Sequence, residues 1–369
     1  YPESKRTDAD TSFCSKGTLF RYSNRDIWCV NHTGGQFLIT LPDQTTFTAN
    51  DGETVLAAAA RQNLNLPHSC KSGACGQCKA ELVSGDIQMG EHSEQALSEA
   101  EKAQGKILMC CTTAQSDISI NIPGYNANAL PVRTLPARIE SMVFKHDVAL
   151  LKLALPKAPP FAFYAGQYID LLLPGNISRS YSIANSPDQE GILELHIRRR
   201  ENGVCSEMIF GSEPKVKEKG IVRIKGPLGS FTLQEDSSKP IILLATGTGY
   251  APIRSILLDL IRQDSSRAVH FYWGARHQDD LYALEEAQEL TGRLKNARFT
   301  PVLSKAAEGW QGEKGYVQTA AAKDYPDLSG YEVYACGSVA MTESAKSALT
   351  AQCSLPETTF YSDAFSPAQ

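Results

Sequence analysis

The chain has 369 residues, 42% of them hydrophobic, so it is too long for one ordinary domain and can form two or three domains with buried cores. Its formal net charge is −5 and it has no basic tract, which argues against nucleic acid as a partner. No apolar run is long enough to cross a bilayer, and the polar N-terminal segment lacks a signal-peptide core. We therefore expect no membrane span and a cytoplasmic protein, with its ten cysteines kept reduced.

Residues 1–33 fit no pattern that we can interpret. The segment is polar, begins with Tyr1 and carries Cys14 and Cys29, which we interpret as free thiols. We treat it as an N-terminal extension and assign it no function.

Three cysteines stand in one short run with the spacing Cys-x4-Cys-x2-Cys, and a fourth follows farther along the chain. This spacing is typical of the thiolate ligands of a plant-type [2Fe–2S] cluster. Gly73, Ala74 and Gly76 lie within the run, where small residues let a tight loop turn its backbone amides toward the sulfurs. The alternatives are scattered core cysteines or a zinc site, although zinc sites favour paired Cys-x2-Cys units and this chain has one. The predicted ligands are Cys70, Cys75, Cys78 and Cys110.

The surrounding segment, 34–122, has the pattern of a small domain with a hairpin, a helix that begins after Thr54, and an alternating strand at 117–122. It resembles the plant-type ferredoxin domain, which implies a ferredoxin-like β-grasp fold. In that family the fourth ligand directly follows an apolar pair. The resemblance therefore implies Cys110, and not its neighbour Cys111, as the fourth ligand.

A second pattern follows a stretch rich in proline and asparagine, within which we place a linker at 123–132. Short β-like runs then alternate with turns, which predicts an antiparallel barrel over 133–236. The runs are 148–155, 167–173, 180–184, 192–198 and 221–225.

The pattern changes again in 237–369, where apolar strands alternate with helical periodicity. This alternation predicts an α/β domain with a doubly wound parallel sheet. The predicted strands are 241–245, 269–273, 297–303 and 332–336, and the helices are 253–261, 281–290, 316–323 and 340–351.

Two polar sequence motifs in the barrel indicate a flavin-binding site. The first contains an arginine that can pair with a phosphate, a tyrosine that can lie against an isoalloxazine ring, and a serine that can reach the flavin N5. The second has the pattern of a turn into a helix N-terminus, where amides bind a pyrophosphate. Taken alone, the first motif also fits the polar end of an ordinary strand. The residues are Arg179, Ser180, Tyr181 and Ser182, followed by Gly203, Val204, Cys205 and Ser206.

Together these two motifs resemble the flavin domain of the ferredoxin–NADP reductase superfamily, as does the segment 226–231. Within the segment 195–199, we assign Ile197 to the cofactor site. In relatives, a C-terminal aromatic residue and a nearby acid flank the flavin. The resemblance thereby implies catalytic roles for Phe365 and Asp363 beside Ser182.

The third domain carries signals for a nicotinamide dinucleotide. Gly247, Thr248 and Gly249 follow the first strand and allow close approach to a pyrophosphate, with Pro252 expected at the first position of the next helix. An ordinary strand–helix turn is the alternative. Cys336 ends the last core strand, and in the superfamily this cysteine stands beside the nicotinamide C4, although a small core residue also fits. Gly274, Gly337 and Met341 complete the predicted cofactor-binding set.

The order of the three domains resembles the NADH-dependent reductase components of bacterial oxygenases, and most of all the CDP-6-deoxy-Δ3,4-glucoseen reductases. It implies that hydride passes from NADH to FAD and that single electrons then pass through a [2Fe–2S] cluster to a separate protein. NADPH stays possible, because Ser304, Lys305, Lys314 and Tyr316 resemble the group that grips a 2′-phosphate. The downstream protein is expected to be a dehydrase or an oxygenase component. A redox-sensing or binding protein without a dedicated catalytic partner is the alternative of another class.

Overall fold

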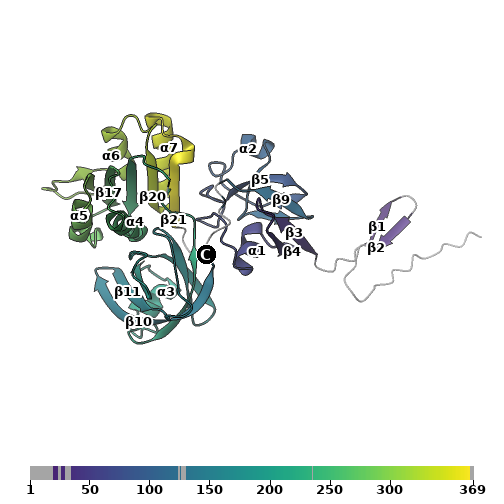
Figure 1. The fold of residues 1–369 in the computed structure, drawn as a ribbon, viewed down its shortest axis with the longest axis horizontal. Helices are drawn as coiled ribbons and strands as arrows, with labels where there is room; N and C mark the ends of the chain where they lie inside the picture. Colours follow the sequence, from purple (N-terminus) through teal and green to yellow (C-terminus); the bar gives the residue numbers. More distant parts are fainter. Residues whose placement is uncertain are drawn as a thin grey trace, which may run out of the picture.

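A computed structural model describes residues 20–23, 26–29, 35–123, 125, 130–234 and 236–365 (Figure 1). Strands β1 (Phe20–Ser23) and β2 (Asp26–Cys29) pair with each other antiparallel. The rest of the N-terminal extension, 1–33, lies outside the described residues except where these strands run. Half of the predicted linker at 123–132 lies outside them too, as do the side chains of Cys14 and Cys29.

The first domain is a mixed sheet with the order β4-β3-β9-β5-β7, against which one helix packs. Helix α1 begins after Thr54, whose hydroxyl accepts a hydrogen bond from Ala57 N at 3.2 Å and caps a free amide. The parallel pair β3–β9 inside an otherwise antiparallel sheet gives the β-grasp fold that the sequence predicts. The elements are β3 (Gln36–Thr40), β4 (Thr46–Asn50), α1 (Val55–Arg61), β5 (Lys79–Ser84), β6 (Ile87–Met89), α2 (Glu99–Ala103), β7 (Lys106–Leu108), β8 (Thr112–Ala114) and β9 (Ile118–Asn121).

The second domain is an antiparallel sheet with the order β13-β12-β15-β10-β11-β14. A bridge between Ile183 and Leu195 joins its two edges, so the sheet closes into the predicted barrel around an apolar core. The elements are β10 (Arg133–Lys145), β11 (Val148–Ala154), β12 (Tyr168–Leu173), β13 (Ile177–Ser182), β14 (Ile192–Arg198), α3 (Val204–Phe210) and β15 (Ile221–Leu228).

Strand β10 starts within the proline-containing stretch and carries Pro136 inside it. Pro136 lies opposite Arg223 of β15, while the pairing of β10 with β11 begins only at Arg138. Because this part of β10 has a partner strand on one side only, the missing proline N–H removes no ladder bond on the other side.

The third domain is a parallel sheet with the order β19-β18-β17-β16-β20-β21. The chain moves outward in one direction from β16 and returns to its other side with β20, so the switch point lies between these two strands. Ligands bind at such a point, outside the carboxyl ends of the strands. The elements are β16 (Ile241–Thr246), α4 (Tyr250–Arg262), β17 (Val269–Ala275), α5 (Leu284–Gly292), β18 (Ala297–Leu303), β19 (Glu313–Lys314), α6 (Val317–Asp324), β20 (Glu332–Ser338), α7 (Val339–Cys353) and β21 (Phe360–Phe365).

Helix α4 starts earlier than the sequence predicts. It begins at Tyr250, which makes Pro252 its third residue and not its first. The first four N–H groups of a helix have no intrahelical acceptor, so proline is tolerated at the third position as well.

The last strand, β21, was not predicted. It pairs in parallel with β20 at the sheet edge, and its end lies where the three domains meet (Figure 1). Within the described part of the chain, no helix is both long and apolar enough to cross a lipid bilayer.

Candidate functional site

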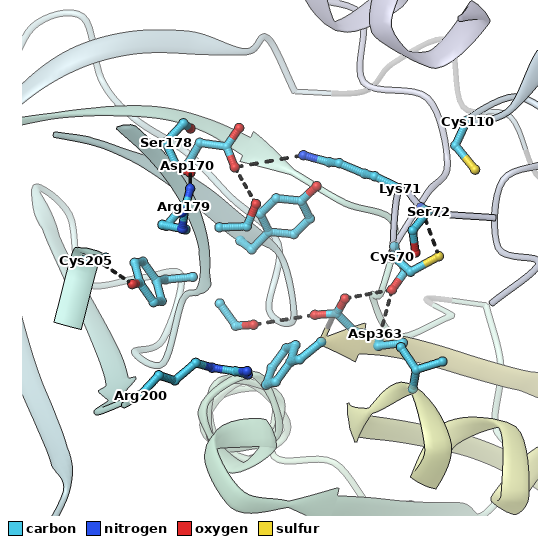
Figure 2. A pocket seen from close by; sticks show the side chains of 18 of the residues that line it. Cys70, Lys71, Ser72, Cys110, Asp170, Ser178, Arg179, Arg200, Cys205 and Asp363 are labelled. Atoms are coloured by element: carbon cyan, nitrogen blue, oxygen red, sulfur yellow. Dashed lines mark hydrogen bonds and ion pairs between the residues drawn. The ribbon is translucent and has the colours of Figure 1, made fainter. Parts of the chain in front are cut away.

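A cavity of about 1850 Å³ lies at the junction of the three domains. It is larger than the roughly 300–1,000 Å³ of most single-ligand sites, so it has room for a dinucleotide and part of a second cofactor. Figure 2 shows Cys70 and Cys110 on one side of it, Arg179, Arg200 and Cys205 on the other, and Asp363 between. The predicted site residues that line it are Cys70, Cys110, Arg179, Ser180, Tyr181, Ser182, Gly203, Val204, Cys205, Ser206, Thr248, Asp363 and Phe365.

The barrel side of the cavity carries two arginines that have no acidic partner in the part of the chain that the structure describes. Arg179 within β13 and Arg200 after β14 line the cavity, and neither forms an ion pair with a carboxylate among the described residues. Two uncompensated guanidinium groups facing one cavity fit the pyrophosphate of FAD. The sequence prediction missed Arg200, although the run of arginines at 198–200, directly before the Gly203 turn, was a signal for it.

The two predicted flavin-binding motifs, 179–182 and 203–206, lie next to each other in the structure. The Tyr181 hydroxyl lies 2.9 Å from the Cys205 sulfur at the start of α3, so strand β13 and the helix turn form one wall. Burial, followed by Cys205, raises the pKa of Tyr181, which keeps the phenol neutral. Ser206 accepts a hydrogen bond from Arg200 N at 2.7 Å and so closes the turn that leads into α3. A neutral ring beside an open turn suits an aromatic cofactor and its phosphates.

Asp363 on β21 occupies the middle of the site. Its carboxylate accepts hydrogen bonds from Ser69 at 3.0 Å and from Ser182 at 3.5 Å. Burial raises the pKa of Asp363 to about 6, against the two serine hydrogen bonds that lower it. One carboxylate from the third domain therefore contacts both the barrel and the first domain.

The predicted nicotinamide-binding motifs, 247–249 and 336–337, lie at the switch point of the parallel sheet. A side chain on Gly249 would collide with the carbonyl oxygen of Cys336, and one on Gly337 would collide with Thr246. Glycine at both positions lets the turns after β16 and β20 approach each other closely. Of this predicted group, Thr248 lines the cavity.

Several predicted site residues do not line the cavity. Cys336 is fully buried beneath the Gly249 turn, and burial raises the pKa of its thiol. Ile197 lies in the barrel core, and Gly274 packs closely against Val317 of α6, which is a structural reason for glycine there. The remaining members of this group are Cys75, Cys78, Gly247, Gly249, Pro252, Gly337 and Met341.

The four predicted cluster ligands form two close pairs. The Cys75 thiol hydrogen-bonds to Cys70 and lowers the pKa of Cys70, and the sulfurs of Cys78 and Cys110 are 3.2 Å apart. No group of three or more such side chains in the described part of the chain could hold a single metal ion. Two pairs of thiols instead fit the two irons of a [2Fe–2S] cluster, each of which takes two thiolates.

The backbone conformation of the loop around these cysteines requires glycine at two positions. Gly73 has a φ of +72° and Gly76 a φ of +74°, conformations that other residues rarely adopt. A side chain on Gly73 would lie 2.7 Å from the sulfur of Cys111. Cys111 itself is 3.5 Å from Cys110, so a fifth sulfur lies beside the predicted ligand set.

The first domain contacts the barrel through this loop. His68 Nε2 lies 2.5 Å from the Tyr168 hydroxyl, and burial lowers the pKa of His68 to about 4, so the ring is neutral. Lys71 lies 3.9 Å from Asp170 and above the ring of Tyr168 (Figure 2). The sequence prediction placed none of these residues at the site, because the partners are about a hundred positions apart.

Three known families match the chain in the predicted order. The 2Fe-2S iron-sulfur cluster binding domain matches residues 39–115, the oxidoreductase FAD-binding domain matches 138–233, and the oxidoreductase NAD-binding domain matches 243–347.

Curated relatives and a solved structure extend over nearly the whole chain. It is 40% identical to the CDP-6-deoxy-L-threo-D-glycero-4-hexulose-3-dehydrase reductase of Yersinia pestis over 330 residues, which covers 89% of this chain and 98% of the relative. It is 32% identical to the reductase component of propane 2-monooxygenase of Rhodococcus jostii, covering 89% and 90%. The structure of the Amycolatopsis cytochrome P450 reductase GcoB matches with a TM-score of 0.74 at 32% identity, covering 90% of this chain and all of that one.

Proposed function

Because this chain belongs to the NAD(P)H-dependent reductases that join a [2Fe–2S] domain to an FAD-binding and an NAD-binding domain, we propose that it supplies single electrons to a separate catalytic protein. When bound, FAD takes two electrons as a hydride from NAD(P)H, and the cluster passes them on one at a time. One NAD(P)H thus reduces two one-electron acceptors and leaves NAD(P)⁺ and a proton.

The single observation that carries this proposal is the shared cavity. Cys70 and Cys110 of the first domain line the same cavity as Tyr181 and Ser182 of the barrel and Thr248 of the third domain. The protein therefore brings the predicted ends of the electron path together inside one molecule. Its residues bind and orient the cofactors and exclude water, and no acid–base triad is required.

The proposed acceptor is a dehydrase that acts on a nucleotide-linked deoxyhexulose. The name of the Yersinia pestis relative supports this partner, at higher identity than the monooxygenase reductase of Rhodococcus jostii. The oxygenase component is the second candidate, and the reductases that support it cover nearly as much of this chain.

Reconstitution tests both candidates. The purified protein, loaded with FAD and cluster, is mixed with NADH and either the CDP-6-deoxyhexulose 3-dehydrase or an oxygenase component, each with its own substrate. We expect sustained NADH oxidation coupled to product with the dehydrase. Coupling only with the oxygenase would move the assignment to the second candidate. Cluster reduction by NADH without turnover with either partner would favour a redox sensor.

We also propose that the protein works in the cytoplasm. None of the eight described cysteines outside the N-terminal extension forms a disulfide, a state that a reducing compartment maintains. Fractionation of the source cells with an antibody against the protein tests this location, and recovery outside the cytoplasmic fraction would contradict it.

A further inference from the structure

Ser69 joins the cluster loop to the last strand of the third domain. It immediately precedes Cys70, and its hydroxyl donates a hydrogen bond to Asp363 Oδ1 at 3.0 Å. The same oxygen accepts a hydrogen bond from Ala364 N at 2.7 Å. A serine hydroxyl has a single proton to donate, so these two bonds fix both its position and its orientation.

The other oxygen of Asp363 faces the barrel. It accepts a hydrogen bond from Ser182, the residue that ends β13 and is predicted to reach the flavin N5, at 3.5 Å. Asp363 and Ser182 are each only 6% exposed, so water does not compete for these bonds. Consecutive contacts thus run from Cys70 through Ser69 and Asp363 to Ser182.

We propose that Ser69 is a positioning residue, which holds the loop bearing Cys70 at a fixed distance from the flavin side of the cavity, with Asp363 as its anchor. The inference rests on the proposed function, because it requires electrons to pass to the cluster within one molecule. In each transfer the flavin is oxidised by one electron and the cluster is reduced by one, and no bond forms or breaks at Ser69.

The other contacts of the loop make this role separable from docking as a whole. The contacts of His68 with Tyr168 and of Lys71 with Asp170 do not involve the Ser69 hydroxyl. The first domain should therefore remain on the barrel, while the backbone next to Cys70 loses its tie to β21. The expected defect lies in one electron-transfer step and not in folding.

The test is anaerobic stopped-flow mixing of the full, cofactor-loaded protein with NADH, in which flavin reduction and cluster reduction are followed separately by their visible spectra. For Ser69→Ala we expect flavin reduction within about twofold of the unmodified protein. Cluster reduction should slow about tenfold, because a lost hydrogen bond to a charged group lowers the population of the loop position that it holds by about that factor. Ser69→Thr, which keeps the hydroxyl, should restore most of the rate.

Ser93→Ala is the matched control. Ser93 follows the same cysteine loop, and its hydroxyl accepts a bond from Gln95 N within the first domain. This variant should leave both phases unchanged. Hydrogen exchange gives a readout independent of electron flow, because the Ala364 amide should exchange faster in Ser69→Ala and not in Ser93→Ala.

Two results would overturn the inference: wild-type cluster reduction in Ser69→Ala, or an equal slowing of flavin reduction. If Ser69→Ala loses its cluster, Ser69→Val, which has the shape of Ser69→Thr without its hydroxyl, replaces it, with the same slow cluster phase expected and a wild-type rate counting against the role. A cluster that NADH fails to reduce even in the unmodified protein would instead refute the proposed function.

Discussion

At the scale of single residues, Asp363 is buried and accepts hydrogen bonds from both of the other domains. Burial, partly offset by hydrogen bonds from Ser69 and Ser182, raises its pKa from 3.8 to about 6. A folded-state pKa above the unfolded value means that the native protein binds this proton more tightly. The stability that the group contributes is therefore present below about pH 4 and lost as the pH rises through about 6.

Asp363→Asn cannot ionise, so it should remove this pH dependence. The difference in the free energy of unfolding, variant minus unmodified protein, should increase by about 1–2 kcal/mol from pH 5 to pH 8. Urea titrations across this range measure the difference. Asp279→Asn, at an exposed position, controls for the loss of one negative charge. Parallel stability curves for Asp363→Asn and the unmodified protein would show that the carboxyl group titrates normally.

Cys110 and Cys111 offer a second prediction at this scale. The Cys110 sulfur is 3.2 Å from Cys78, whereas Cys111 contacts Cys110 at 3.5 Å, so we keep Cys110 as the fourth ligand. Cys110→Ser should lose most of the visible iron–sulfur absorbance and Cys111→Ser should retain it, with iron content measured in parallel. The reverse pattern would assign the ligand to Cys111.

Cys336 remains a predicted nicotinamide contact although it is fully buried under the Gly249 turn. Geometry at the reacting atoms is worth more than general binding contacts, so Cys336→Ser should slow flavin reduction by NADH about tenfold or more. FAD content should stay unchanged. Cys336→Ala separates the role of the sulfur from the effect of a buried hydroxyl. Normal stopped-flow reduction in both variants would return Cys336 to the core.

At the scale of elements, we expect the ends of β18 and β19 to determine which dinucleotide the third domain accepts. Ser304, Lys305, Lys314 and Tyr316 are all exposed at this edge, and neither lysine forms an ion pair among the described residues. We still predict NADH, on the resemblance to NADH-dependent reductases, with a kcat/KM about tenfold above that for NADPH. Steady-state assays with both donors measure this ratio.

Lys305→Ala sharpens the comparison. If the edge does not bind a 2′-phosphate, the variant should change the two kcat/KM values by the same small factor. A selective loss with NADPH, together with a higher kcat/KM for NADPH in the unmodified protein, would show that Ser304 and Lys305 grip the phosphate and that the donor is NADPH.

At the scale of the whole molecule, the flavin and nicotinamide residues all lie in the fragment 133–369. It contains the barrel core and both apolar faces of the parallel sheet, so it should fold, bind FAD and reduce ferricyanide with NADH. It should not reduce cytochrome c efficiently, because the predicted one-electron exit is in the missing domain. Its Tm should fall by a few degrees, since Tyr168 and Asp363 lose buried partners.

Paired assays with the full chain measure each of these properties. A fragment that passes electrons to the protein partner as fast as the full chain would make the flavin the direct donor and the first domain an accessory.

The sequence alone determined what depends on near neighbours. The cysteine spacing, the glycines with positive φ around Gly73, and the change from β to helical periodicity are local, and they predicted the cluster loop, the barrel and the parallel sheet. The sequence also predicted that β13 and the Gly203 turn belong to one flavin site, because two flavin-binding motifs at a typical spacing are rarer than either motif alone.

Only the tertiary structure decided which of these residues meet. Strand β21 carries Asp363 to within hydrogen-bonding distance of Ser69, almost three hundred positions earlier. The tertiary structure also places Arg200 at the cavity and Cys336 beneath a turn, and the contact of Ile183 with Leu195 closes the barrel. Such contacts follow from sheet order and domain packing, which depend on the burial of whole apolar faces, and no pattern of neighbouring residues encodes them.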